Sequence, residues 1–224
     1  MEDGKRKTEN PSSVYPLFVD LRGAKVLVVG GGSVAARKVP ALLEAGAIVT
    51  VVAPDVDVSI GASGKNLRIL RRGFRVSDIQ KQKLVFAATS NTKLNQRIAA
   101  AAKRARILVN VAAPPEAGDV QIPSVVRRGS MCVAVSTGGA SAALAAAWRR
   151  KLEAIIGPEW SEWVAELERL RARILCDIPN ERARRAVLLD LGRLRWARAV
   201  KTQGLSQVRR EVDARILKAA RKAR

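Results

Sequence analysis

The chain has no histidine, and it is poor in acidic, aromatic and cysteine residues. Without an imidazole it cannot use a histidine base, a serine–histidine pair or a histidine metal ligand. Proton transfer would therefore depend on a carboxylate, a lysine, a cysteine, the single tyrosine Tyr15 or the substrate itself. An aromatic fraction of 4% also leaves no array of rings on which nucleic-acid bases could stack.

The two cysteines, Cys132 and Cys176, stand far apart and form no CxxC pair. They indicate neither a metal centre nor a disulfide framework, so we expect a reduced, cytoplasmic protein. The apolar runs are too short to span a bilayer, and we expect no membrane segment. The polar, charged N-terminus lacks the apolar stretch of a secretory signal, and we expect a disordered leader at residues 1–14.

Basic residues outnumber acidic residues by 41 to 20, which gives a formal net charge of +21. Residues 181–224 alone carry fourteen basic and four acidic side chains, a net charge of +10. Such a charge suits nucleic acid, an anionic membrane surface or a polycarboxylate ligand, or it serves only to keep the surface soluble. The composition leaves these alternatives open.

Residues 26–52 read as a strand, a glycine-rich turn, a helix and a second strand. Gly30, Gly32 and Ala35 are spaced as G-x-G-x-x-A, which is the dinucleotide-binding fingerprint when it follows a strand and opens a helix. Gly30 permits the tight turn, Gly32 lets backbone N–H groups approach a pyrophosphate, and Ala35 lets the helix pack close to the strand. A plain glycine turn is the alternative, but the two flanking strands favour a cofactor site.

Further strands are predicted at residues 66–70, 84–88 and 107–111, with a helix at 93–104. Strands that alternate with helices predict a doubly wound parallel α/β sheet of the Rossmann type. Residues 15–21 precede the first strand and read as an extended edge segment.

Polar residues follow two of the predicted strands, at the edge where open α/β sheets bind ligands. Asp55 stands a little over twenty residues beyond Gly32, where a carboxylate can accept hydrogen bonds from the adenosine ribose and would repel the extra phosphate of NADP. We therefore expect NAD, although a simple turn aspartate is the alternative. Thr89 and Ser90 follow the strand at 84–88 and are further candidates for contact with the cofactor.

The second half of the chain reads as a β-hairpin followed by helices. The hairpin is predicted at residues 120–126 and 131–136, and a helix at 142–156 would be capped by Ser141. Three amphipathic helices follow, at 160–174, 181–200 and 207–220. The loop at residues 136–141 could hold a carboxylate with its backbone amides, or it could be only a glycine turn with a capping serine.

Five segments together resemble a known family, the bifunctional precorrin-2 dehydrogenases and sirohydrochlorin ferrochelatases of siroheme synthesis. In order, they are YPLFVDLRGAKVLVVGGGSVAARK, IVTVVAPD, LVFAATSNTKLNQRI, NVAAPPEAGDVQIPS and VAVSTGGASAALA. The resemblance covers about residues 15–150 and implies an NAD-binding domain at 15–113. It also implies a dimerisation region at 114–150, a helical domain at 151–224, and an intertwined homodimer with a cleft between the domains.

The resemblance implies family NAD contacts at Ser33, Val34, Pro54 and Asp55, which join the candidates taken from the glycine spacing and from the strand ends. The expected cofactor contacts are Gly30, Gly31, Gly32, Ser33, Val34, Pro54, Asp55, Thr89 and Ser90. The expected substrate contacts, which would line a tetrapyrrole cleft, are Asn110, Ser136, Thr137, Gly138 and Gly139.

One departure from the family pattern concerns catalysis. Family members commonly carry an aspartate three residues beyond Asn110, but this chain has Ala113 there, and alanine can neither accept a proton nor bind a metal. The nearest carboxylates are Glu116 and Asp119, of which Asp119 is our candidate catalytic residue. We expect no resident metal, and Fe²⁺ would be a substrate only if the chelatase is active.

The implied activity is the NAD-dependent oxidation of precorrin-2 to sirohydrochlorin, with weak or absent iron insertion. A non-catalytic protein that binds NAD or a tetrapyrrole is the alternative. Nucleic-acid binding through the basic C-terminal segment is a third and less favoured interpretation.

Overall fold

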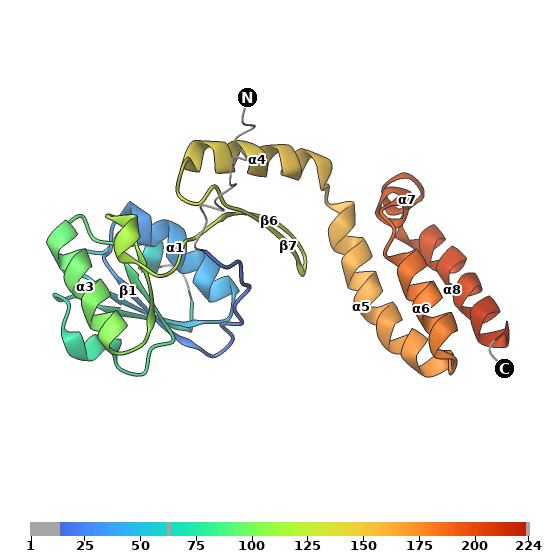
Figure 1. Cartoon of the computed structure of the whole chain (residues 1–224), viewed down its shortest axis with the longest axis horizontal. Helices are drawn as coiled ribbons and strands as arrows, with labels where there is room; N and C mark the ends of the chain where they lie inside the picture. Colours follow the sequence, from blue (N-terminus) through green and yellow to red (C-terminus); the bar gives the residue numbers. More distant parts are fainter. Residues whose placement is uncertain (1–13, 62–63, 223–224) are drawn as a thin grey trace, which may run out of the picture. The chain divides into compact units, whose positions relative to one another are not determined.

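The computed structural model describes residues 14–61 and 64–222 (Figure 1). The chain forms two compact units, Met1–Ile122 and Pro123–Arg224. The leader predicted at residues 1–14 lies, apart from its last residue, outside the described residues. The finer division of the chain at residues 113 and 150 stays a prediction.

The first unit is built on one parallel sheet with the strand order β3-β2-β1-β4-β5. The strands are β1 (Lys25–Val29), β2 (Ile48–Val52), β3 (Leu67–Leu70), β4 (Leu84–Ala87) and β5 (Leu108–Val111). The order reverses between β1 and β4, which is the arrangement of a doubly wound sheet. The predicted fold class is confirmed.

The helices of this unit cover both faces of the sheet. They are α1 (Ser33–Glu44), the short α2 (Val58–Gly61) and α3 (Thr92–Arg104), with 3₁₀ turns η1 (Val76–Ile79) and η2 (Pro115–Ala117). Val26 and Val28 of β1 pack on the side of α1, whereas Leu27 and Val29 pack on the side of α3. Because successive strand residues face opposite sides, a sheet buried on both faces needs a continuous apolar run.

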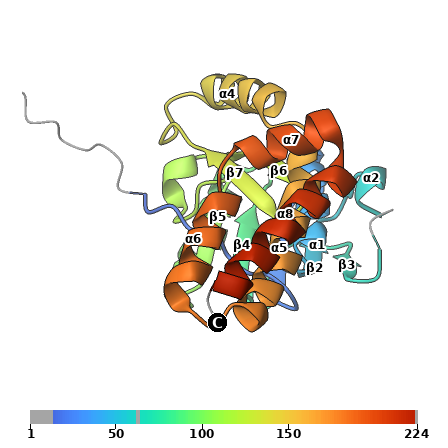
Figure 2. The same ribbon diagram turned by 90° about the vertical axis from the view of Figure 1, so that its right-hand side faces the viewer.

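The second unit begins with an antiparallel hairpin, β6 (Ser124–Arg128) and β7 (Met131–Val135). Five helices follow: α4 (Ala142–Ile155), α5 (Glu159–Asp177), α6 (Glu181–Leu191), α7 (Arg195–Gln203) and α8 (Leu205–Lys222). The last four share a core, in which the rings of Trp163 and Trp196 stack with centroids 5.8 Å apart. Figure 2 shows α5, α6 and α8 side by side.

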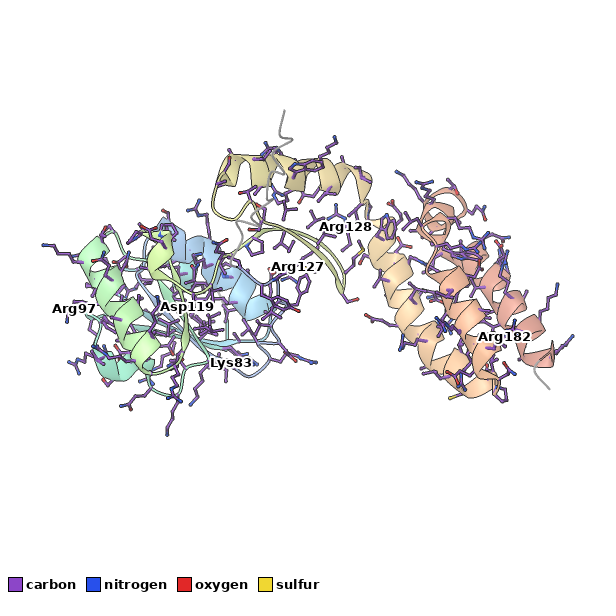
Figure 3. The ribbon with its side chains drawn as sticks, in the orientation of Figure 1. Lys83, Arg97, Asp119, Arg127, Arg128 and Arg182 are labelled. Atoms are coloured by element: carbon purple, nitrogen blue, oxygen red, sulfur yellow. The ribbon has the colours of Figure 1, made fainter. Side chains whose placement is uncertain are left out.

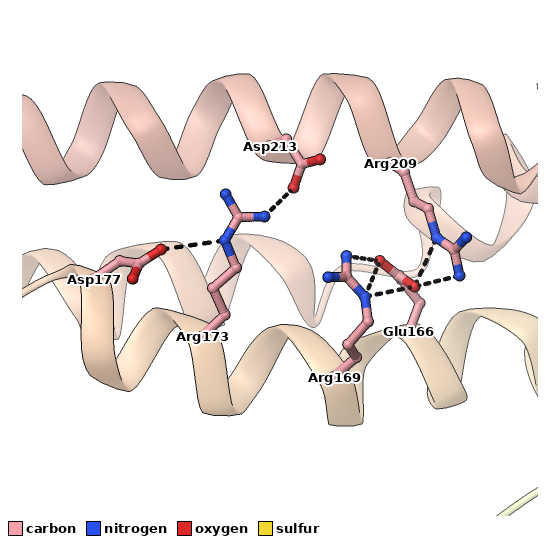
Figure 4. Close-up of polar contacts among 6 residues, drawn as sticks. All are labelled: Glu166, Arg169, Arg173, Asp177, Arg209 and Asp213. Carbon is pink, nitrogen blue, oxygen red and sulfur yellow. Dashed lines mark hydrogen bonds and ion pairs between the residues drawn. The ribbon is translucent and has the colours of Figure 1, made fainter.

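A buried carboxylate links two helices of this core. Glu166 on α5, whose side chain is 1% exposed, accepts hydrogen bonds from Arg169 on the same helix and from Arg209 on α8 (Figure 4). Arg173 on α5 joins the same two helices through Asp213 on α8, and it also bonds to Asp177 on its own helix. Burial alone would raise the pKa of the Glu166 carboxyl, but the bonds from the two arginines outweigh it and hold the pKa below its ordinary value.

Three sequence predictions about individual elements are wrong. The helix predicted at 181–200 is two helices, because the chain turns at Gly192 and the Trp196 indole donates to the carbonyl of Asp190 (2.9 Å). The hairpin starts at Ser124 rather than at residue 120, since the N–H of Val120 bonds to β5. Residues 15–21 do not pack as an edge segment, since they join neither sheet and their apolar side chains are mostly exposed.

Within the described ranges 14–61 and 64–222, no helix is both long enough and apolar enough to cross a bilayer. The same residues contain no group of three or more cysteine, aspartate or glutamate side chains arranged to hold a metal ion.

Candidate cofactor and substrate site

A cavity of about 760 Å³ opens in the first unit where β1, β2 and β4 end. This edge of the sheet is where the strand order reverses, which is where open α/β sheets bind ligands. All nine residues predicted to contact the cofactor line the cavity: Gly30, Gly31, Gly32, Ser33, Val34, Pro54, Asp55, Thr89 and Ser90.

Two of the three glycines are required by the fold itself. A Cβ atom at Gly30 would lie 2.3 Å from the carbonyl oxygen of Ala88, and Gly30 also has a positive φ of 118°. A Cβ atom at Gly31 would lie 2.1 Å from the carbonyl oxygen of Asp55. Both positions bring the turn close to the neighbouring strand ends, which only glycine allows.

Gly32 differs, because a Cβ atom there would meet nothing within 4 Å. Gly32 is the N-cap of α1, and no side chain caps that helix end. The first N–H groups of a helix have no partner within the helix, and they attract anions together with the helix dipole. The open space at Gly32, the uncapped end of α1 and the absence of an acidic residue from its first turn fit a pyrophosphate.

The end of β2 offers one free carboxylate to the cavity. Asp57 also lines the cavity, but its carboxylate accepts hydrogen bonds from the hydroxyl (2.6 Å) and the N–H (2.9 Å) of Ser59, which lower its pKa. Asp55 is exposed, and the structure gives its side chain no hydrogen bond or ion pair with any residue in its described ranges. Asp55 therefore has a free carboxylate at the cavity, and its role toward ribose hydroxyls stays a prediction.

A cavity wall that sequence reasoning missed comes from the loop after β3. Gly73 and Phe74 lie in this loop and line the cavity. The loop is held by Arg72, whose guanidinium donates two hydrogen bonds, of 2.9 and 2.6 Å, to the carboxylate of Asp78. The loop follows the carboxyl end of a predicted strand, and that position indicates a part of the ligand site in open α/β sheets.

Asn95 is a second residue that the sequence did not reveal. This fully buried side chain on α3 accepts hydrogen bonds from the N–H (3.2 Å) and the hydroxyl (2.7 Å) of Thr89. Its amide donates to the carbonyl oxygens of Thr89 and Ala113, at 3.0 Å each. Asn95 thereby ties the cavity wall after β4 to the loop after β5, where the family aspartate would stand.

The two predicted polar residues around β5 do not line the cavity. Asn110 is 7% exposed, and its amide donates to the carbonyl of Val120 (2.7 Å). Asp119 pairs with Lys103 at 3.5 Å, and its N–H bonds to Val109 near the start of β5. Figure 3 labels Asp119 in the first unit. Lys103 lies at the C-terminal end of α3, so Asp119 sits toward the amino ends of the strands, away from the cavity.

The remaining candidate residues belong to the loop before α4, in the second unit. The hydroxyl of Thr137 accepts from the N–H of Ser141 (3.1 Å) and donates to its carbonyl (3.0 Å). Ser141 caps α4 as predicted, by accepting from the N–H of Leu144. Ser136 accepts a hydrogen bond from the N–H of Gly138. These contacts make an ordered turn, and its role toward a carboxylate stays a prediction.

The parallel sheet, the glycine turn and the uncapped helix define a dinucleotide-binding protein of the Rossmann class. Comparison with known families agrees, because a family model described as "Putative NAD(P)-binding" matches residues 17–124. The chain is similar to siroheme synthases from three bacteria, over 172 residues and 76% of its length in each case. Identity is 38% in Pseudomonas putida, 39% in Methylococcus capsulatus and 40% in Nitrosococcus oceani.

The chain spans little more than a third of the length of these relatives, 36–37%. Among solved structures, it is similar to "SirC, precorrin-2 dehydrogenase", with a TM-score of 0.71 and 27% identity, over 90% of this chain and 100% of SirC. The resemblance found in the sequence is confirmed: the chain is similar to the matching part of the siroheme synthases and to SirC over the whole of that chain.

Proposed function

We propose that this chain catalyses the NAD-dependent oxidation of precorrin-2 to sirohydrochlorin, a step of siroheme synthesis. The cavity carries the proposal, because all nine expected cofactor residues line it within a fold similar to that of a precorrin-2 dehydrogenase. The two free cysteines, Cys132 and Cys176, support a cytoplasmic location as part of this proposal.

The residues of the cavity have distinct tasks in this proposal. The N-terminus of α1 and the space at Gly32 would hold the pyrophosphate. The Asp55 carboxylate would accept hydrogen bonds from ribose hydroxyls and repel the extra phosphate of NADP. When bound, NAD⁺ supplies the hydride acceptor. Basic side chains and the amides of the loop at residues 136–139 would hold the substrate carboxylates, which suits the net charge of +21.

Iron insertion is the weaker part of the family's activity in this proposal. Ala113 offers no carboxylate where the family aspartate would stand, and Asp119 is paired with Lys103. Hydride transfer depends mainly on position, whereas chelation also needs a group that handles pyrrole protons and the ion. We therefore propose measurable oxidation with weak or absent chelation, and Asp119 as a replacement carboxylate stays a prediction.

A homodimer is also part of the proposal. Leu144, Trp148 and Ile155 lie along one side of α4, at spacings of four and seven residues, and each is about half exposed or more. An apolar stripe of this kind is typical of a surface that a partner covers. A second copy of the chain, as in the family, would cover it.

The test is an absorbance assay with precorrin-2 and NAD⁺. We expect the spectrum of sirohydrochlorin and the absorbance of NADH to appear together, in equal amounts, and only with the protein present. Binding of both ligands without turnover would instead favour the non-catalytic alternative. The Gly32→Asp variant is the control for activity that does not depend on the cavity.

A further inference from the structure

Lys38 places an ammonium group beside the crevice where the strand order reverses. Lys38 stands one turn beyond Val34 on the same side of α1, and Val34 lines the cofactor cavity. Its Nζ lies 5.3 Å from the centroid of the Phe86 ring on β4, the strand that neighbours β1. Lys38 therefore reaches from the helix after β1 toward the strand on the other side of the crevice.

This ammonium has no anionic partner within the residues that the structure describes, 14–61 and 64–222. The structure instead places its Nζ over the face of the Phe86 ring, a cation–π contact with a residue that is 2% exposed. Partial burial lowers the pKa of Lys38, and the positive charge of Arg37 lowers it further. A partly desolvated cation beside another cation costs free energy, and an aromatic face compensates only part of that cost.

The surroundings of Lys38 suit an anion attached to a large ring. Phe86 pairs in register with Asn110 of β5, so the two side chains share the face of the sheet that Lys38 overhangs. The pyrophosphate of a dinucleotide is already provided for at Gly32 and the first turn of α1. Lys38 lies about 6 Å further along the axis of α1 than Val34 and does not line the cavity.

We propose that Lys38 binds a carboxylate of the tetrapyrrole, with Phe86 as the apolar floor beneath its ammonium group. The inference rests on the proposed function, since the tetrapyrrole supplies the carboxylate. The carboxylate replaces the water that the ammonium loses through burial, and it neutralises the charge shared with Arg37. Lys38 is thus a residue for substrate affinity rather than for cofactor affinity.

The test is direct binding of sirohydrochlorin, the product, which needs no turnover. Lys38→Met keeps the length of the side chain and its cover over Phe86, but removes the charge. We expect the Kd for sirohydrochlorin to rise about tenfold or more, as for the loss of a charge-assisted hydrogen bond. We expect the Kd for NAD⁺ to stay within about twofold. Lys38→Arg should restore most of the affinity, which also shows that the site folds.

Lys93→Met is the matched control. Lys93 is exposed on α3, and the variant loses the same charge from the same residue type. Equal affinity of Lys38→Met and Lys93→Met for sirohydrochlorin would overturn the inference and leave the proposed function standing. A loss of NAD⁺ affinity in Lys38→Met equal to its loss of sirohydrochlorin affinity would assign Lys38 to the cofactor and also overturn it. Failure of the unmodified chain to bind sirohydrochlorin would refute the proposed function itself, and the inference with it.

Discussion

The side-chain amide of Asn95 donates a 3.0 Å hydrogen bond to the carbonyl oxygen of Ala113, and its other hydrogen bonds all go to Thr89. One buried side chain thus joins the ends of β4 and β5. Both carbonyl oxygens that it serves would lose their donor if the amide were removed, and an unpaired buried acceptor is costly.

Asn95→Asp tests this junction with almost no change of shape. The carboxylate still accepts from Thr89 but cannot donate to the carbonyls of Thr89 and Ala113. We expect the free energy of unfolding to fall by about 1–3 kcal/mol in urea titrations followed by circular dichroism. Asn91→Asp is the control, because Asn91 caps α3 only as an acceptor from Leu94. An equal effect of both variants would contradict a specific role for Asn95.

Gly32→Asp tests the cofactor site. The added side chain enters open space, so we expect the melting temperature without NAD to stay close to that of the unmodified chain. A negative charge at the N-terminus of α1 repels a pyrophosphate, so we expect calorimetry to detect no NAD binding. Gly31→Ala is the opposite control, because its Cβ would clash with the carbonyl of Asp55 and destabilise the fold. Unchanged NAD affinity in Gly32→Asp would place the cofactor elsewhere.

Ala113→Asp tests the missing carboxylate. Ala113 is exposed, and its carbonyl is fixed by Asn95, so a carboxylate there needs no rearrangement of the loop. We expect iron insertion into sirohydrochlorin to increase, because general base help is worth about 10²–10⁴-fold. Efficient insertion by the unmodified chain would show that another group already does this work.

Asp119→Ala separates two views of the remaining carboxylate. If Asp119 replaces the family aspartate, both activities fall by about 10²–10⁴-fold. If the only role of Asp119 is its ion pair with Lys103, toward the amino ends of the strands, either rate changes by less than tenfold. Steady-state rates of oxidation and of iron insertion decide between the two.

The exposed stripe on α4 predicts how the chain assembles. We expect light scattering to show a homodimer, and Trp148→Glu to shift it to a monomer by placing a charge in the apolar stripe. Glu153→Gln is a control on the same helix. Glu153 pairs with Arg149 and is not part of the apolar stripe, so this change should leave the dimer intact. A stable monomer of the unmodified chain across the micromolar range would refute the dimer.

Glu166 makes the stability of the second unit sensitive to acid. Its pKa lies below the ordinary value of 4.5, so its contribution is complete above that pH and is lost as the pH falls through the lower folded pKa. All four tryptophans lie in the second unit, and their fluorescence reports its unfolding alone. We expect Glu166→Gln to destabilise the unit at pH 7 and to flatten its loss of stability below pH 4.5. Glu162→Gln, an exposed change on α5, should do neither.

The sequence predicted the features that depend on neighbouring residues. Local patterns predict the strands around Gly30, the glycine turn and the position of Asp55. Residues from all three line the cavity. The caps at Asn91 and Ser141 are of the same kind, because a cap lies three residues from the N–H that it serves.

The features that were missed depend on chain segments that are distant in sequence. Asn95 reads as one of several polar residues in its helix, and its partner Ala113 is 18 positions away. The location of Asp119 depends on the return of the chain along β5, where a Cβ atom at Gly118 would lie 2.8 Å from the carbonyl of Val109. The break at Gly192 was hidden because the apolar period continues across it.

The glycine turn also separates two kinds of evolutionary constraint. Replacement of Gly30 or Gly31 would be removed by selection for folding alone, whether or not any ligand binds. A side chain at Gly32 would clash with no atom of the protein without its ligand, so only a bound ligand preserves this glycine. Among descendants of this chain, a lineage that abandoned the dinucleotide would be expected to keep the first two glycines and drift at the third, and position 32 would record when that loss occurred.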